Sequence, residues 1–119
     1  MQNFQNLAVW QKAHRLTLDL YRSTKQFPKD ELFGLTGQIR RASVSIGANI
    51  AEGCGRTGPD FGRFLQIAVG SASELQYHLL LSRDLGLISA RDYERLAGQL
   101  TDTKKMLVRL LGTVKAANS

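Results

Sequence analysis

The sequence predicts an all-α protein, an up-down-up-down antiparallel four-helix bundle formed by a single domain of residues 1–119. Apolar residues recur at three- and four-residue steps in four segments, which is the spacing of one helix face. Both prolines, Pro28 and Pro59, fall between those segments rather than inside them. The connections between the segments are short, and short connections favour antiparallel neighbours in a bundle.

The first predicted helix begins after Asn6, a good N-cap residue, and ends before Pro28, because the residue before a proline disfavours the helical conformation. The second predicted helix begins in the run from Pro28 to Glu31, whose residues suit a first turn, and ends at the glycines on either side of Cys54. The core stripes of these two helices are Val9, Ala13, Leu16 and Leu20 in the first, and Leu35, Ile39, Ala42, Ile46 and Ile50 in the second.

The third predicted helix has Pro59 in its first turn and ends near Gly86, and Ser89 caps the fourth, with Asp92 three positions later. Their core stripes are Phe61, Leu65, Ala68, Ala72, Leu75 and Leu79 in the third, and Tyr93, Leu96, Leu100, Thr103, Leu107, Leu110 and Val114, at a heptad step, in the fourth. Helices of roughly 20 to 28 residues would make a rod about 30 to 40 Å long.

The chain is basic, with 16 Lys and Arg against 10 Asp and Glu and a net charge of +6. Such a charge draws a protein to polyanions. The candidate nucleic-acid contacts lie on the outer faces of the first and fourth predicted helices, which could be neighbours in the bundle; they are Lys12, Arg15, Arg22, Lys104, Lys105 and Arg109. A solvated basic face with no partner is the alternative, and the charge by itself does not decide between the two.

A row of polar residues runs beside the apolar stripe of the second predicted helix, at the same spacing. The rest of that helix is covered by small residues, so we expect other helices to press close on several sides. The polar row would then be buried and hydrogen-bonded, because unpaired buried polar groups are costly. The structural polar network predicted in this way comprises Arg41, Asn49, Glu52, Ser71 and Glu74. The alternative is a catalytic or ligand-binding cluster, for which the sequence supplies no nucleophile or cofactor motif.

No motif predicts an enzyme, a cofactor or a metal site. Residues Gly53–Gly58 match G-x-G-x-x-G, but the dinucleotide-binding form needs a strand before it, and a helix cap followed by a turn fits better. His14 and His78 lie in no cluster of metal ligands, although Glu74 and His78, four residues apart, could form half a site.

No signal-peptide pattern opens the chain, and no apolar run approaches the roughly 20 residues needed to span a bilayer. Cys54 is the only cysteine, so no intramolecular disulfide can form. We therefore expect a cytoplasmic protein with no membrane partner.

Two segments, Gln38–Gly53 (QIRRASVSIGANIAEG) and Phe61–Leu75 (FGRFLQIAVGSASEL), resemble the four-helix-bundle proteins of the 23S rRNA intervening-sequence type, also labelled S23 ribosomal proteins. Asn6–Leu16 and Phe27–Gln38 fit the same family, so the resemblance covers nearly the whole chain. Gly47 stands where proline is expected in many relatives, which loosens the local backbone without threatening the fold.

The resemblance implies a homo-oligomer, expected as a pentameric ring, with no known enzymatic activity. A related branch, the accessory variability determinants of diversity-generating retroelements, is understood to bind RNA or a reverse transcriptase through its basic surface. We therefore expect a non-enzymatic oligomer that binds RNA, or DNA, through its basic helix faces. The alternative is a protein-interaction scaffold with no nucleic-acid ligand, in which Trp10, Phe64, Ile67 and Leu81 contact partner subunits or another protein.

Overall fold

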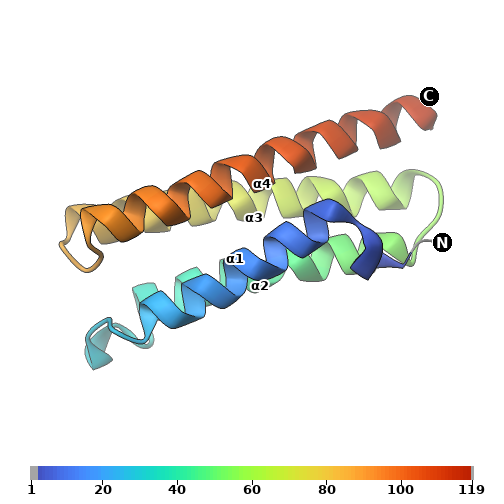
Figure 1. The fold of residues 1–119 in the computed structure, drawn as a ribbon. Coiled ribbons are helices and arrows are strands. Elements are labelled where there is room, and N and C mark those ends of the chain that lie inside the picture. Colours follow the sequence, from blue (N-terminus) through green and yellow to red (C-terminus); the bar gives the residue numbers. More distant parts are fainter. Residues whose placement is uncertain (1–2, 119) are drawn as a thin grey trace.

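The computed structural model describes residues 3–118, which form the four helices of an antiparallel bundle (Figure 1). The helices are α1 (Ala8–Thr24), α2 (Leu35–Cys54), α3 (Pro59–Asp84) and α4 (Ala90–Ala117), with the short 3-10 helices η1 (Phe4–Asn6) and η2 (Lys29–Glu31) before α1 and α2. Each helix packs against the next, and α4 packs back against α1. The predicted fold class is therefore confirmed.

The bundle is a rod of 46 × 22 × 20 Å, slightly longer than expected, although α1 has only 17 residues. Both ends of the chain lie at the end of the rod where α2 turns into α3, and the α1–α2 and α3–α4 connections lie at the opposite end (Figure 1). Among residues 3–118, no helix is both long enough and apolar enough to cross a membrane.

The helix stripes predicted from the sequence form the core. Every residue of the predicted α1 and α2 stripes is buried, as are Leu65, Ala68, Ala72, Leu75 and Leu79 of α3. Phe61 and Tyr93, the first residues of the α3 and α4 stripes, are only partly buried and pack against the edge of the core. In α4 the heptad step fails at its end, because the buried residue is Leu111 while Leu110 and Val114 are only partly buried. A straight helix drifts by about 20° per heptad, which moves the core-facing position later along the chain.

Two predicted helix starts need correction. Asn6 is not the N-cap of α1, since it lies inside η1, and α1 begins at Ala8 with Leu7 as its N-cap. The run from Pro28 to Glu31 does not open α2 either. It forms η2, and the chain then breaks at Gly34 (φ −106°, ψ −119°).

Glu31 nonetheless contributes to the start of α2 from outside the helix. Its Oε1 accepts a hydrogen bond from the backbone N–H of Leu35, at 3.2 Å. This satisfies one of the amides that a helix start leaves without an intrahelical partner, and it places a carboxylate near the positive end of the helix dipole. Glu31, which was expected in the first turn of α2, therefore lies before the helix and caps it through its side chain.

The α3–α4 connection confirms the predicted helix end and start. Gly86 has φ +74°, its N–H donates to Arg83 O (3.0 Å), and the Leu87 N–H donates to Ser82 O (2.9 Å). This pair of hydrogen bonds is a Schellman motif, in which glycine adopts the left-handed conformation at least cost. Ser89 then caps α4 by accepting from the Asp92 N–H at 3.1 Å.

Helices α2 and α3 lie close together near the connection between them. A Cβ atom at Gly53 would lie 2.8 Å from Phe61 Cδ1 and 3.1 Å from Phe64 Cβ, closer than carbon atoms tolerate. Glycine at this position thus allows α3 to cross the end of α2. At Gly47, by contrast, a Cβ atom would lie 3.5 Å from Trp10 Nε1, an ordinary contact.

These two glycines give a matched pair of variants. We expect Gly53→Ala to lower the free energy of unfolding by about 1 to 3 kcal/mol through overpacking against Phe61. Gly47→Ala should raise it, by up to about 1 kcal/mol, because alanine is the better helix former and finds room. Urea unfolding followed by circular dichroism measures both, and shifts of the same sign would contradict the packing described for Gly53.

Candidate nucleic-acid interface

The positive charge is concentrated on two of the four helices. Helix α1 carries Lys12, Arg15 and Arg22 against Asp19, and α4 carries six cationic residues against three acidic ones. Helices α2 and α3 together carry four of each sign and so have no net charge. Helices α1 and α4 pack side by side (Figure 1), as the sequence analysis allowed for the two helices that carry the candidate contacts. The half of the bundle formed by α1 and α4 is therefore basic, and the half formed by α2 and α3 is neutral.

The seam between α1 and α4 nevertheless contains carboxylates from both helices. Lys12 Nζ lies 3.9 Å from Asp102 Oδ2, and Asp19 is 3.0 Å from Arg22 Nη1 and 3.8 Å from Arg95 Nη1. Lys12 and Arg22 thus have carboxylate neighbours, whereas Arg15 is exposed and forms no ion pair with a described residue. The six candidate cations therefore do not merge into one patch across this seam.

The three α4 candidates instead line a hollow on the other side of α4, between α4 and α3. We call it the basic hollow; it has a volume of about 500 Å³ and is lined by Gln76, Thr101, Lys104, Lys105, Val108 and Arg109. Lys104 Nζ donates a hydrogen bond to Gln76 Oε1 at 3.0 Å. Because this acceptor is neutral, the bond leaves the positive charge of Lys104 uncompensated. Within residues 3–118, Lys105 and Arg109 form no ion pair. The structure thus gathers three positive charges in one concave site.

A second hollow adjoins the basic hollow along the same seam. This tyrosine hollow, of about 310 Å³, shares Gln76 and Thr101 with it and is also lined by Tyr77, Leu80 and Tyr93. Sequence reasoning did not identify Gln76 or Tyr77 as site residues. In the sequence, these two residues are distinguished by being polar within the apolar pattern of α3. That observation points to a site once the structure shows that α4 lies beside them.

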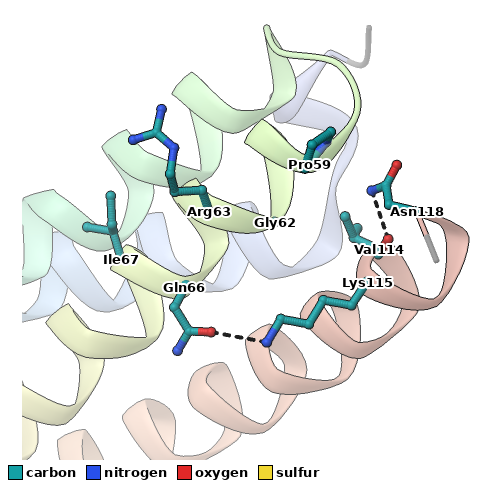
Figure 2. Close-up of a pocket in the computed structure, with 8 residues that line it drawn as sticks. All are labelled: Pro59, Gly62, Arg63, Gln66, Ile67, Val114, Lys115 and Asn118. Carbon is teal, nitrogen blue, oxygen red and sulfur yellow. Dashed lines mark hydrogen bonds between the residues drawn. The ribbon is translucent and has the colours of Figure 1, made fainter.

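A third hollow, of about 490 Å³, lies at the far end of the seam, where α3 begins and α4 ends. Figure 2 shows Gln66 of α3 and Lys115 of α4 pointing toward one another across it, with a Nζ–Oε1 distance of 3.5 Å. Arg63 lies on its α3 side, where its guanidinium packs over Phe64, at 4.8 Å from the ring centroid. Cationic residues thus recur along the seam beyond the basic hollow.

The predicted polar network is formed only in part. Ser45 Oγ of α2 and Ser71 Oγ of α3 are 2.7 Å apart, and Asn49 Nδ2 donates to Ser45 O (2.8 Å) and Ser45 Oγ (3.0 Å). These three residues make a half-buried cluster that joins the two helices.

The other members of that network are exposed, which corrects the expectation that the whole row is buried. Glu52 pairs with Arg56 at 3.5 Å, Glu74 on α3 lies 3.0 Å from His78 Nε2, and Arg41 on α2 is exposed. The physical reason is that only α1 and α3 pack along α2, so its outer side stays open in a single chain.

Arg40, and not Arg41 of the predicted network, is the arginine that joins α2 to α1. Its Nε donates to Thr24 Oγ1 at 3.0 Å and its Nη2 to Tyr21 O at 3.3 Å. Its guanidinium also lies over the Tyr21 ring, at 4.7 Å from the centroid.

The glycine-rich run has the geometry of a helix end followed by a turn. Gly53 and Cys54 are the last two residues of α2, and Arg56 pairs with Glu52 and lies over the Phe64 ring. Burial raises the pKa of the Cys54 thiol, which keeps it protonated and weakly nucleophilic at neutral pH. Among residues 3–118, no three His, Cys, Asp or Glu side chains are grouped as metal ligands.

The four apolar residues considered for partner contacts differ in exposure. Trp10 packs partly against the core and stacks on His14, with ring centroids 4.8 Å apart, and Leu81 and Phe64 are half-buried. Ile67 is 43% exposed. Of the four, Ile67 has the largest exposed fraction.

Comparison with known proteins identifies relatives. A family model described as 23S rRNA-intervening sequence protein matches residues 5–109, from η1 into the last third of α4. A crystal structure of a protein of unknown function from the S23 ribosomal protein family of Bacteroides thetaiotaomicron VPI-5482 is similar, with a TM-score of 0.79 and 28% sequence identity over 87% of this chain and 98% of that chain. No functionally curated protein matches the chain.

The serine contact between α2 and α3 can be tested for a structural role. Ser71→Ala removes the hydrogen bond to Ser45 and should lower the free energy of unfolding by about 0.5 to 1.5 kcal/mol. Ser73→Ala is the matched control, because Ser73 Oγ bonds only to Val69 O within α3 and is exposed. Urea unfolding of both variants isolates the cross-helix contribution, and equal midpoints would contradict it.

Proposed function

The chain belongs to the 23S rRNA-intervening sequence protein family, and we propose that it is a non-enzymatic, self-associating protein that binds RNA through its basic helices. The observation that carries this proposal is the basic hollow, which is lined by Lys104, Lys105 and Arg109. None of these three cations forms an ion pair with a residue in the range 3–118. Arg15 on the exposed face of α1 would add a further contact. The family name refers to 23S rRNA, so RNA is the first nucleic acid to test and DNA is the competitor.

The proposed mode of binding is contact with phosphates. Lysine and arginine side chains neutralise phosphate charge and release counterions, which makes affinity fall steeply with salt. Such contacts position a nucleic acid without reading its sequence. The protein would therefore bind many RNA sequences with similar affinity, and its selectivity would come from the shape of the RNA.

Self-association is the second part of the proposal, and it would remain if the protein were a scaffold with no nucleic-acid ligand. Val44 on α2 and Ile67 on α3 are 46% and 43% exposed, and these two helices together carry no net charge. Exposed apolar side chains on helices without net charge suit a contact between copies, and the family resemblance implies a pentameric ring. Repetition of the basic hollow in such a ring would make weak contacts multivalent.

Charge reversal tests the RNA-binding proposal. The triple variant Lys104→Glu, Lys105→Glu, Arg109→Glu should weaken RNA binding by about ten-fold or more, measured by fluorescence anisotropy at low salt. The triple variant Lys25→Glu, Lys29→Glu, Arg41→Glu removes the same charge from exposed positions outside α4 and should lose far less. Equal losses in the two variants would show that net charge alone is responsible and would contradict a defined interface.

Sedimentation equilibrium tests self-association. We expect a native mass that is a multiple of the 13.2 kDa chain, and a decrease toward one chain in the variant Val44→Glu, Ile67→Glu. The exposed pair Leu18→Glu, Leu85→Glu, on α1 and the α3–α4 connection, is the control and should leave the mass unchanged. A monomer at working concentration would contradict the proposal.

A further inference from the structure

We propose that the tyrosine hollow and the basic hollow together form a site for single-stranded nucleic acid, in which a base stacks on Tyr77 while phosphates contact Lys104, Lys105 and Arg109. This inference rests on the proposed RNA binding and goes beyond it by naming the form of nucleic acid that is bound. The two hollows adjoin along the seam between α3 and α4, because Gln76 and Thr101 line both. We call the stretch of the seam that contains both hollows the groove; an aromatic ring and three cations line it.

Tyr77 is the tyrosine whose ring is open to a ligand. It is 59% exposed, and among residues 3–118 the one aromatic ring close to it is that of His78, at an oblique 50° with the centroids 6.1 Å apart. The other two tyrosines already carry a cation on one face: Arg40 lies 4.7 Å from the centroid of Tyr21, and Arg83 lies 4.9 Å from that of Tyr93. An exposed ring beside a basic groove is the arrangement on which bases stack in single-strand-binding proteins.

The acidic residues nearest in sequence to the basic hollow, Asp102 and Glu74, contact other residues. Asp102 follows Thr101 but lies on the α1 side of α4, 3.9 Å from Lys12 Nζ. Glu74 precedes Gln76 by two residues and lies 3.0 Å from His78 Nε2. Their carboxylates therefore do not neutralise the three cations of the groove, and the groove keeps a field that favours an anion.

The shape of the site favours a single strand over a duplex. Thr101 and Arg109 are about 12 Å apart along α4 at the rise of an α-helix, which gives room for only a few nucleotides. A base within a duplex is stacked between its neighbours and cannot reach Tyr77, so a duplex could use the cations alone. An unpaired strand could use the ring and the cations together.

The experiment compares two probes by fluorescence anisotropy: a labelled oligouridine of about 20 nucleotides, longer than one such site, and an RNA duplex of the same length. Tyr77→Leu should weaken binding of the oligouridine by about ten-fold and leave duplex binding within about two-fold. Tyr77→Phe keeps the aromatic face and should retain affinity for the oligouridine. Tyr21→Leu, outside the groove, is the matched control and should change neither probe.

The outcomes separate this inference from the function on which it rests. Equal affinity for both probes, or no effect of Tyr77→Leu, would overturn the single-strand site. In that case, RNA binding through phosphates would still be supported if the charge-reversal variant of Lys104, Lys105 and Arg109 loses binding. Failure of the unmodified protein to bind either probe at low salt would overturn both proposals. A Tyr77→Phe variant as weak as Tyr77→Leu would also overturn base stacking, because the ring would be present without its effect.

Discussion

The close packing of α2 against α3 is the constraint on which the rest of the bundle depends. Helix axes approach more closely where the residues between them are small. Gly53 leaves room for Phe61 and Phe64, and farther along the same seam Ser45 and Ser71 meet at 2.7 Å. The short connection between the two helices fixes them as an antiparallel pair, and α1 and α4 complete the bundle against this pair.

This constraint divides the surface into two halves with different chemistry. The closely packed pair carries no net charge, and Ser45 and Ser71 form a hydrogen bond between the two helices. The excess of lysine and arginine is carried by α1 and α4. On the α1 side, Arg95 of α4 lies 3.8 Å from Asp19, whereas on the α3 side Lys104 and Lys115 meet the neutral side chains of Gln76 and Gln66. The nucleic-acid site that we propose therefore lies on the α3 side of α4.

The family relationship and the packing constraint involve the same residues. The two segments that carry the resemblance, Gln38–Gly53 and Phe61–Leu75, are those that form the α2–α3 contact. A family member of 28% identity shares the bundle, and the family model covers both segments. The small residues that α1 and α3 leave uncovered on the outer side of α2 are consistent with the proposed contact between copies.

The sequence by itself determined the four helices, most of their core residues, the Ser89 cap and the glycine that ends α3, because apolar spacing and terminal residues act locally. The prediction that α2 begins in the run from Pro28 to Glu31 was wrong, because a 3-10 turn and the first turn of an α-helix favour the same residues. Only the tertiary structure decided that Ser71 meets Ser45 while Arg41 and Glu52 stay exposed, and that Lys104 faces Gln76 rather than α1. The period of a helix fixes the angle at which each side chain leaves the axis, but which neighbour covers that angle depends on how all four helices pack.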